Sequence, residues 1–148
     1  MRVAPLAFLL AAACATTLVK QDIRRQSDGW TVTFHELLDG PNGFTARNGT
    51  EYTPKAGERF LWVIVSVHND GSAPRQFTFD SCGLDVGSGG TSLPLYVGLD
   101  LGTASQVTPT PELASGEELT RKLAFGYPAK RFPSKLVCLG NDIPLARP

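Results

Sequence analysis

The stretch from Arg59 to Asp70, RFLWVIVSVHND, restricts the fold more than any other part of the chain. Its apolar side chains alternate with a period of two, which is the repeat of a β-strand. One face carries Leu61, Val63, Val65 and Val67, and the other carries Phe60, Trp62, Ile64, Ser66 and His68. Because β-branched and aromatic residues occupy both faces near its beginning, the pattern predicts a central strand that is covered on both sides there.

Shorter strands surround this one. They are predicted at residues 30–34, 76–79, 119–127 and 135–139, with turns rich in glycine and proline between them. The chain contains 15 glycines and 11 prolines in 148 residues, which favours many turns and few long helices. Short strands between such turns predict an all-β antiparallel two-sheet sandwich, and the length predicts one domain, which we place at residues 29–148.

Three pieces of the chain resemble, in this order, the immunoprotective extracellular immunoglobulin-like domains of bacterial secreted antigens and lipoproteins. They are the strand from Phe60 to Val67, closing on Asn69; Phe77-x-Phe79-Asp80 with Gly83 after it; and Leu113-x-x-Gly116, followed by Leu123-Ala124-Phe125-Gly126-Tyr127-Pro128 and a last strand at 136–139. Two positions depart from the family pattern, since Ser115 replaces the usual proline and Leu84 the usual tyrosine. The resemblance implies an immunoglobulin-like sandwich outside the cytoplasm, and it implies no catalytic residues.

Residues 1–13 have the pattern of a signal peptide. Arg2 supplies a positive start, and residues 6–13 form an apolar run shorter than the roughly 20 residues that span a bilayer. The segment Leu10-Ala11-Ala12-Ala13-Cys14 resembles a bacterial lipobox, although Ala11 stands where leucine is usual. We therefore predict that Cys14 is lipidated and that residues 14–28 form a polar tether, with a first strand at its end as the alternative. Ordinary cleavage before Thr16, which gives a secreted protein, stays open as the alternative.

The number of cysteines supports the same prediction. Cys14, Cys82 and Cys138 are the three cysteines of the chain, and exported proteins pair their cysteines in disulfides. A Cys82–Cys138 bond leaves Cys14 as the unmatched residue, and lipidation accounts for it. Two buried thiols, or a thiol pair that binds a soft metal, remain alternatives for Cys82 and Cys138.

Charge and motif content exclude several classes of function. The chain has 14 basic and 14 acidic residues, so it lacks the basic excess that nucleic-acid binding requires. His35 and His68 are the only histidines, and neither lies in a ligand spacing typical of a metal site. Ser66 lies on the same strand face as His68 but without a G-x-S-x-G context. We predict no catalytic residue, no metal site and no cofactor.

The remaining candidate for a functional surface is an apolar segment between glycine-rich stretches. Leu93, Leu95, Tyr96 and Val97 either form a further core strand or present apolar anchors to a partner. The sequence thus predicts a membrane-anchored lipoprotein of the cell envelope with a non-catalytic binding module for a protein or envelope partner. A metal- or small-ligand-binding envelope protein is the first alternative, and a small envelope enzyme is the second.

Overall fold

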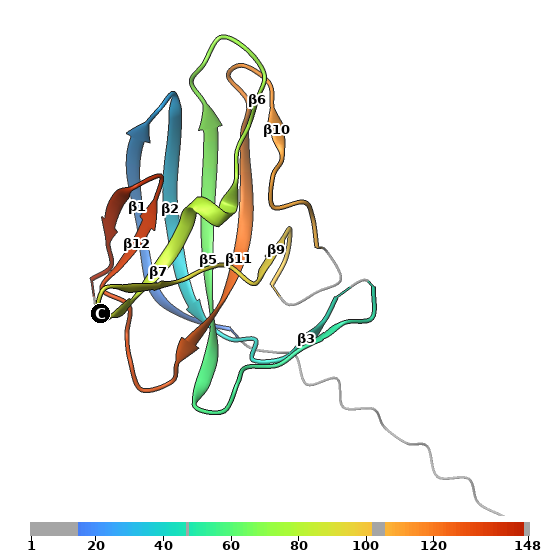
Figure 1. Cartoon of the computed structure of the whole chain (residues 1–148), viewed down its shortest axis with the longest axis vertical. Helices are drawn as coiled ribbons and strands as arrows, with labels where there is room; N and C mark the ends of the chain where they lie inside the picture. Colours follow the sequence, from blue (N-terminus) through green and yellow to red (C-terminus); the bar gives the residue numbers. More distant parts are fainter. Residues whose placement is uncertain (1–14, 47, 102–105, 147–148) are drawn as a thin grey trace, which may run out of the picture.

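The protein is an all-β sandwich of two antiparallel sheets. The structure is a computed structural model that describes residues 15–46, 48–101 and 106–146. The first sheet has the order β1-β2-β5-β11-β9, with bounds β1 (Thr16–Ser27), β2 (Trp30–Asp39), β5 (Glu58–Asn69), β11 (Glu118–Pro128) and β9 (Tyr96–Gly98). The second has the order β13-β12-β7-β8, with bounds β13 (Asn141–Pro144), β12 (Lys135–Cys138), β7 (Cys82–Gly87) and β8 (Gly90–Ser92). Figure 1 shows β7 and β12 lying across the strands of the first sheet.

Two short strand pairs and one helical turn complete the fold. They are β3 (Phe44–Thr45) with β4 (Glu51–Tyr52), β6 (Arg75–Gln76) with β10 (Glu112–Leu113), and the 3-10 turn η1 (Phe79–Ser81). The strand predicted at 76–79 is therefore shorter than expected, because the chain turns at Phe79 while Phe77 and Phe79 stay buried. Within the described ranges, no helix is both long enough and apolar enough to cross a membrane. The predicted immunoglobulin-like antiparallel sandwich is confirmed at the level of two packed sheets.

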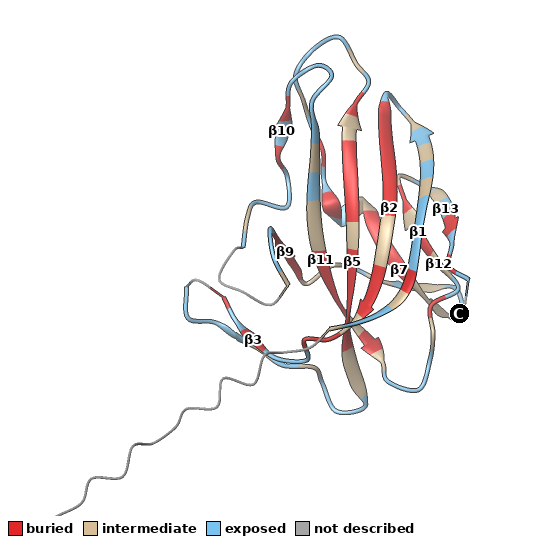
Figure 2. Cartoon of the chain, turned by 180° about the vertical axis from the view of Figure 1, so that it is seen from behind, coloured by how far each residue is buried: buried red, intermediate tan, exposed pale blue. Residues whose placement is uncertain are grey.

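The strand β5 has the predicted central place. It pairs with β2 on one side and with β11 on the other, and Leu61, Val63, Val65 and Val67 are fully buried between the two sheets. On its outer face, Phe60 and Trp62 are also buried, whereas Ile64 and His68 are half-buried. The prediction that this strand is covered on both sides near its beginning is confirmed, and Figure 2 shows the buried residues along it.

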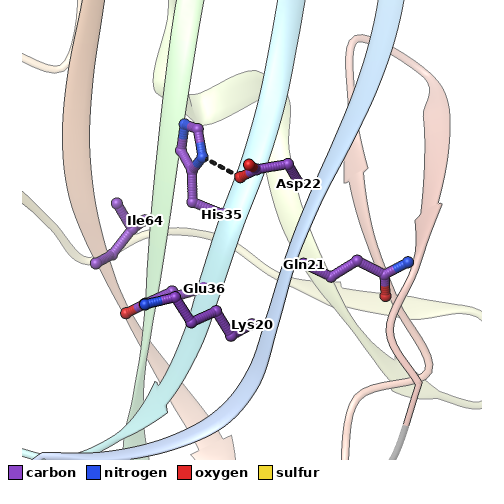
Figure 3. Close-up of a pocket in the computed structure, with 6 residues that line it drawn as sticks. All are labelled: Lys20, Gln21, Asp22, His35, Glu36 and Ile64. Carbon is purple, nitrogen blue, oxygen red and sulfur yellow. Dashed lines mark hydrogen bonds and ion pairs between the residues drawn. The ribbon is translucent and has the colours of Figure 1, made fainter.

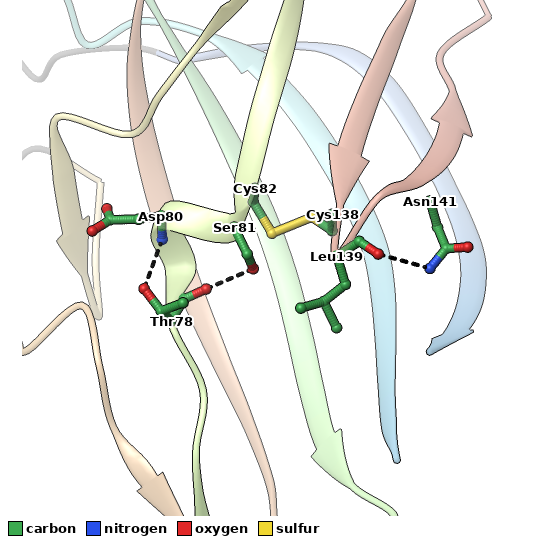
Figure 4. The surroundings of a disulfide bond; sticks show 7 residues. All are labelled: Thr78, Asp80, Ser81, Cys82, Cys138, Leu139 and Asn141. Atoms are coloured by element: carbon green, nitrogen blue, oxygen red, sulfur yellow. Dashed lines mark hydrogen bonds between the residues drawn. A yellow bond between two sulfur atoms is a disulfide. The ribbon is translucent and has the colours of Figure 1, made fainter. Parts of the chain in front are cut away.

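A disulfide joins the two inner strands of the second sheet. Cys82 and Cys138 are directly opposite one another in β7 and β12, with 4.1 Å between their Cα atoms (Figure 4). Both cysteines are buried in the core between the sheets. The bond closes a loop with a sequence separation of 56 residues, and loop entropy alone gives such a cross-link about 4 kcal/mol of stabilisation. The predicted pairing of these two cysteines is confirmed, in place of free thiols.

The predicted polar tether over residues 14–28 is wrong. Thr16–Ser27 forms β1, which pairs antiparallel with β2 along its whole length, so the domain begins near Thr16 and not at residue 29. β1 is an edge strand, and such strands can be largely polar because one edge and one face meet water. Its Val19 is buried in the core and Ile23 packs against it. The turn at Asp28-Gly29 has positive φ angles of 51° and 74°, the conformation of a two-residue hairpin.

A second, aromatic cluster lies on the outer face of the first sheet. The β3–β4 pair covers this face near the beginning of β5, where Phe44 stacks on Tyr52 at 4.9 Å between ring centroids. Phe44 also contacts Trp62 at 5.1 Å and Tyr96 at 4.8 Å. The Trp62 indole donates a hydrogen bond to the backbone oxygen of Pro41 at 3.1 Å. Ala15 packs against the same cluster, so the first described residue is already part of the packed domain.

The partner-binding hypothesis requires the side chains of the apolar segment 93–97 to be exposed, and only some of them are. Tyr96 and Val97 belong to β9 and are buried, with 1% and 5% of their surface exposed, so the hypothesis is wrong for these two residues. Their side chains pack against the two clusters because β9 pairs with β11. Leu95 packs against the aromatic cluster, and Leu93 alone of the four is well exposed, at 57%.

Candidate functional site

The outer face of the first sheet is polar where the aromatic cluster ends. Along β2 and β5, toward the Asp28-Gly29 turn, the outward side chains change from Leu38 and Trp62 to Thr33 and Ser66. Thr33 and Ser66 are cross-strand neighbours, and both are buried although they face away from the main core. The β3–β4 pair does not extend over this half in Figure 2. This polar, uncovered half of the sheet is therefore the candidate binding surface.

Irregularities in two adjacent strands shape this polar half. The pairing of β2 with β5 shifts between Phe34 and Glu36, so His35 is an extra residue in β2. The pairing of β1 with β2 shifts between Lys20 and Ile23, which leaves Asp22 in the irregular part of β1. Bulges of this kind redirect side chains and are frequent beside functional sites. Here they bring the side chains of Asp22 and His35 together above the sheet (Figure 3).

A chain of hydrogen bonds joins four neighbouring strands, from Asp22 on β1 to Thr120 on β11. The Asp22 carboxylate lies 2.6 Å from His35 Nδ1, and His35 Nε2 lies 2.8 Å from the Ser66 hydroxyl. The Ser66 hydroxyl in turn lies 2.7 Å from the hydroxyl of Thr120 on β11. Since an ionised carboxylate can only accept, Nδ1 donates to Asp22, and Nε2 shares the second hydrogen bond with the Ser66 hydroxyl. Every member of the chain therefore has a partner, which holds the histidine in one orientation.

A hollow lies beside this chain. It has a volume of about 400 Å³ and is lined by Lys20, Gln21, Asp22, His35, Glu36 and Ile64. Lys20 forms an ion pair with Glu36 at 2.9 Å, and the hydrogen bond to Glu36 raises the pKa of the lysine. Figure 3 shows Lys20 and Glu36 on one side of the hollow and His35 with Asp22 on the other. The hollow thus offers both signs of charge and an apolar contact at Ile64 to a small or flexible polar group.

The order of Asp22, His35 and Ser66 is that of a nucleophilic triad, but the surroundings differ from those of a hydrolase. Acyl transfer needs hydrogen-bond donors for the developing oxyanion, and these are usually backbone N–H groups beside the nucleophile. Ser66 lies in the middle of β5, where pairing with β2 and β11 takes up the backbone groups on both edges. Ser66 is also only 3% exposed, while the side chain of Asp22 is 77% exposed. Ser66 thus lacks the free backbone donors and the exposure that acyl transfer needs.

The second histidine forms a separate pair on the same face. His68 Nδ1 lies 2.7 Å from one oxygen of Asp70, and the Thr31 hydroxyl donates to the other oxygen at 2.8 Å. The hydrogen bond from Thr31, together with that from His68, holds the pKa of Asp70 below its usual value. Each histidine thus has its own aspartate partner. Among the described residues there is no group of three or more histidine, cysteine, aspartate or glutamate side chains that could hold a metal ion.

Sequence reasoning missed the contact that organises this site. Ser66 was expected beside His68 on one strand face, whereas its hydroxyl contacts His35, which is 31 residues away in the sequence. The register of β2 against β5 and the bulge at His35 create that contact, and neither leaves a signal in the sequence. Of the other predicted site residues, Cys82 and Cys138 form the disulfide and Leu93 is exposed. Cys14 lies outside the described residues.

A second hollow, of about 380 Å³, lies at the end of the sandwich where β11 ends. The Asp85 carboxylate accepts a hydrogen bond from Ser134 and another from the backbone N–H of Gly87, and these bonds lower its pKa. The Tyr127 hydroxyl donates to the backbone oxygen of Asp85, and burial raises the pKa of this tyrosine. These bonds fix the loop after β11, so we regard this second hollow as part of the framework.

Comparison with known proteins supports the fold and adds no function. No protein-family model matches the chain, and no curated protein matches it. The chain is similar to the crystal structure, at 2.2 Å resolution, of a conserved hypothetical protein from Bacillus anthracis, with a TM-score of 0.56 and 17% identity. The similarity covers 84% of this chain and 88% of that one. The sandwich fold is therefore shared over nearly the whole length of both proteins.

Proposed function

We propose that this protein is an exported lipoprotein of the cell envelope, anchored through Cys14, and that it carries a non-catalytic binding module. The leader pattern of residues 1–13 and the unmatched cysteine support the anchor. The Cys82–Cys138 disulfide supports a location in an oxidising compartment. The resemblance to immunoprotective extracellular immunoglobulin-like domains points to the same location.

The observation that carries the binding function is the hydrogen-bonded chain beside the open hollow. Two bulges place Asp22 and His35 at the wall of the hollow, and the imidazole is bonded to Ser66, whose hydroxyl is in turn bonded to Thr120. Side chains fixed before a partner arrives lose little entropy on binding, which favours specific recognition. We infer that the hollow receives a polar, charge-bearing group of a protein or envelope partner.

Site-specific photo-crosslinking tests this proposal. A photoreactive amino acid replaces Lys20 at the hollow. In a control it replaces Lys135, which forms a comparable ion pair with Asp142 on the other sheet, although its side chain is 38% exposed and that of Lys20 is 78% exposed. We expect a saturable cross-link to an envelope component from position 20 that His35→Ala abolishes, and none from position 135. Equal cross-linking at both positions, or none in intact envelopes, would reject this binding surface.

The mass of the N-terminal peptide tests the anchor separately. We expect membrane-extracted protein to begin with a diacylated Cys14, whereas an unmodified peptide that begins at Thr16 would show a secreted protein. The enzymatic alternative has its own test, which is labelling with a fluorophosphonate probe. We expect no covalent adduct on Ser66, and an adduct that requires His35 would replace the binding proposal with a hydrolytic one.

A further inference from the structure

The structure brings the domain much closer to its proposed anchor than a tether would. Since β1 begins at Thr16 and Ala15 already packs against the aromatic cluster, only two peptide steps separate Cys14 from the first strand. Two residues reach at most about 7 Å, whereas a tether over residues 14–28 would reach about 50 Å. If Cys14 carries the lipid, the end of the sandwich where β1 begins must therefore lie at the membrane.

The strand pairing identifies which residues form that end. Thr16 pairs with Asp39, which pairs with Leu61, and β5 continues for three more residues in the same direction to Glu58. At about 3.3 Å per residue, the turn before β5 and the loop after β11 extend about 10 Å beyond the start of β1. A hydrogen bond from Ala129 N to Gly57 O, of 2.9 Å, joins the two loops. They are the parts of the domain that meet a surface first.

These joined loops carry exposed basic side chains. Lys55, Lys130 and Arg131 are exposed, and in the described part of the chain none of the three forms an ion pair. Of the acidic residues near these loops, Asp39 pairs with Arg59 at 2.6 Å and Glu58 is half-buried, whereas Glu51 of β4 is exposed. The loop after β11 is also held in place, because Arg131 donates to the backbone oxygen of Val86 and Arg59 donates to that of Arg131.

We propose that this end is a membrane-contact surface, in which Lys55 and Lys130 bind the phosphates of lipid headgroups. Basic side chains are attracted to an anionic membrane, so two lysines would fix the orientation of a domain that its lipid already holds at the surface. The polar hollow around His35 would then open to the side of the domain, away from the membrane. This inference rests on the proposed lipid anchor.

Fluorescence quenching tests the orientation. The acylated full-length protein, with a bimane on Ala129→Cys or on Ser72→Cys, is bound to vesicles of two parts phosphatidylcholine and one part phosphatidylglycerol that contain a nitroxide-headgroup lipid. Ala129 and Ser72 are both exposed, and they lie at opposite ends of the sandwich. We expect the A129C probe to lose more than half of its fluorescence and the S72C probe to lose little.

The same probe tests the lysines. Adding Lys55→Glu and Lys130→Glu to the A129C protein should reduce the quenching measurably without releasing the protein from the vesicles, because the reversed charges tilt the two loops away from the headgroups while the short link to Cys14 keeps this end of the domain near the membrane. Equal quenching at positions 129 and 72, or quenching at 129 that the double charge reversal leaves unchanged, would overturn the membrane-contact surface while the anchor stands. A protein that fails to float with the vesicles because Cys14 is unmodified would reject the anchor and the contact together.

Discussion

The two halves of the outer face of the first sheet are built from the same strands, but one half is covered by another part of the chain and the other is open to solvent. Where β5 begins, Trp62 and its neighbours are apolar, and the chain folds the β3–β4 pair over them. Farther along the same strand, Ser66 and His68 face outward, and the surface stays open. One strand with one period of alternation therefore supports both a second small core and a polar site. The identity of the outward residues therefore decides which part of this face the β3–β4 pair covers.

The two halves are also held by different forces. Burial of aromatic surface stabilises the covered half, at about 25 cal/mol for each Å² removed from water. The open half depends on hydrogen bonds, whose net contribution to stability is about 1 kcal/mol each because they replace bonds to water. Substitutions in the covered half should therefore change mainly stability, and substitutions in the open half should change mainly binding.

The largest effect is expected for Trp62→Ala. Trp62 is fully buried, and its loss leaves a cavity beneath Phe44 and removes the donor to the Pro41 oxygen. Loss of a buried tryptophan side chain costs about 3–5 kcal/mol of unfolding free energy. Urea denaturation measures this loss, with Ile64→Ala on the same strand face as the control. Because Ile64 is only half-buried, Ile64→Ala should lower the unfolding free energy clearly less than Trp62→Ala. Equal losses for the two variants would contradict the division of the face into two halves.

Phe44→Ala should have a smaller and more local effect. Phe44 contacts Tyr52, Trp62 and Tyr96, but it belongs to a short strand pair that can detach without opening the main core. We expect a loss of about 3 kcal/mol, at the low end for removal of a buried phenylalanine side chain. Hydrogen exchange measures the locality of the change. The amides of β3 and β4 should exchange faster while those of β5 stay protected, and a uniform increase over both sheets would show that the cover is part of the main core.

The same comparison explains what could be predicted from the sequence. Alternation identified β5 because its inner residues are apolar without interruption, and it identified β11 from Leu123, Phe125 and Tyr127, although Arg121 lies on the same face. Cys82 and Cys138 were paired because exported proteins join their cysteines in disulfides. Alternation did not identify β1, because its polar residues and its irregular pairing hide the pattern, although Asp28-Gly29 is a hairpin signal.

The candidate site was harder to predict because long-range register creates it. His35 reaches Ser66 only because β2 contains an extra residue at that point, and Asp22 reaches His35 only because β1 is irregular beside it. A regular strand pair would place Thr33 beside Ser66 and nothing more, as the cross-strand neighbours show. Alternation gives the face of a residue in a regular strand, but it does not give the position of a bulge.

In the open half, His35→Ala should affect stability only modestly. The ring is partly exposed, and Ser66 keeps its contact with Thr120 when the imidazole is removed, so we expect a loss of about 1 kcal/mol. Cross-linking from position 20 should nevertheless be lost. Ser66→Ala and the double variant complete a thermodynamic cycle, and a coupling of at least about 0.5 kcal/mol is expected for residues in one network. Strict additivity would show that the chain of hydrogen bonds does not act as a unit.

The smallest effect concerns the pH dependence of stability at Asp70. Because Thr31 and His68 lower its pKa in the folded protein, the unfolded protein binds a proton at this group more readily near pH 4. The stabilisation is therefore complete above about pH 5 and is lost as the pH falls through the usual value of 3.8 toward the lower folded value. Thr31→Val removes the hydrogen bond that lowers this pKa most, so the unfolding free energy of this variant should fall less steeply between pH 5 and pH 3. The matched control is Thr33→Val, which changes a buried threonine on the same strand face and should keep the wild-type slope. Identical slopes for the wild-type protein and Thr31→Val would show that the open half owes its acid sensitivity to other carboxylates.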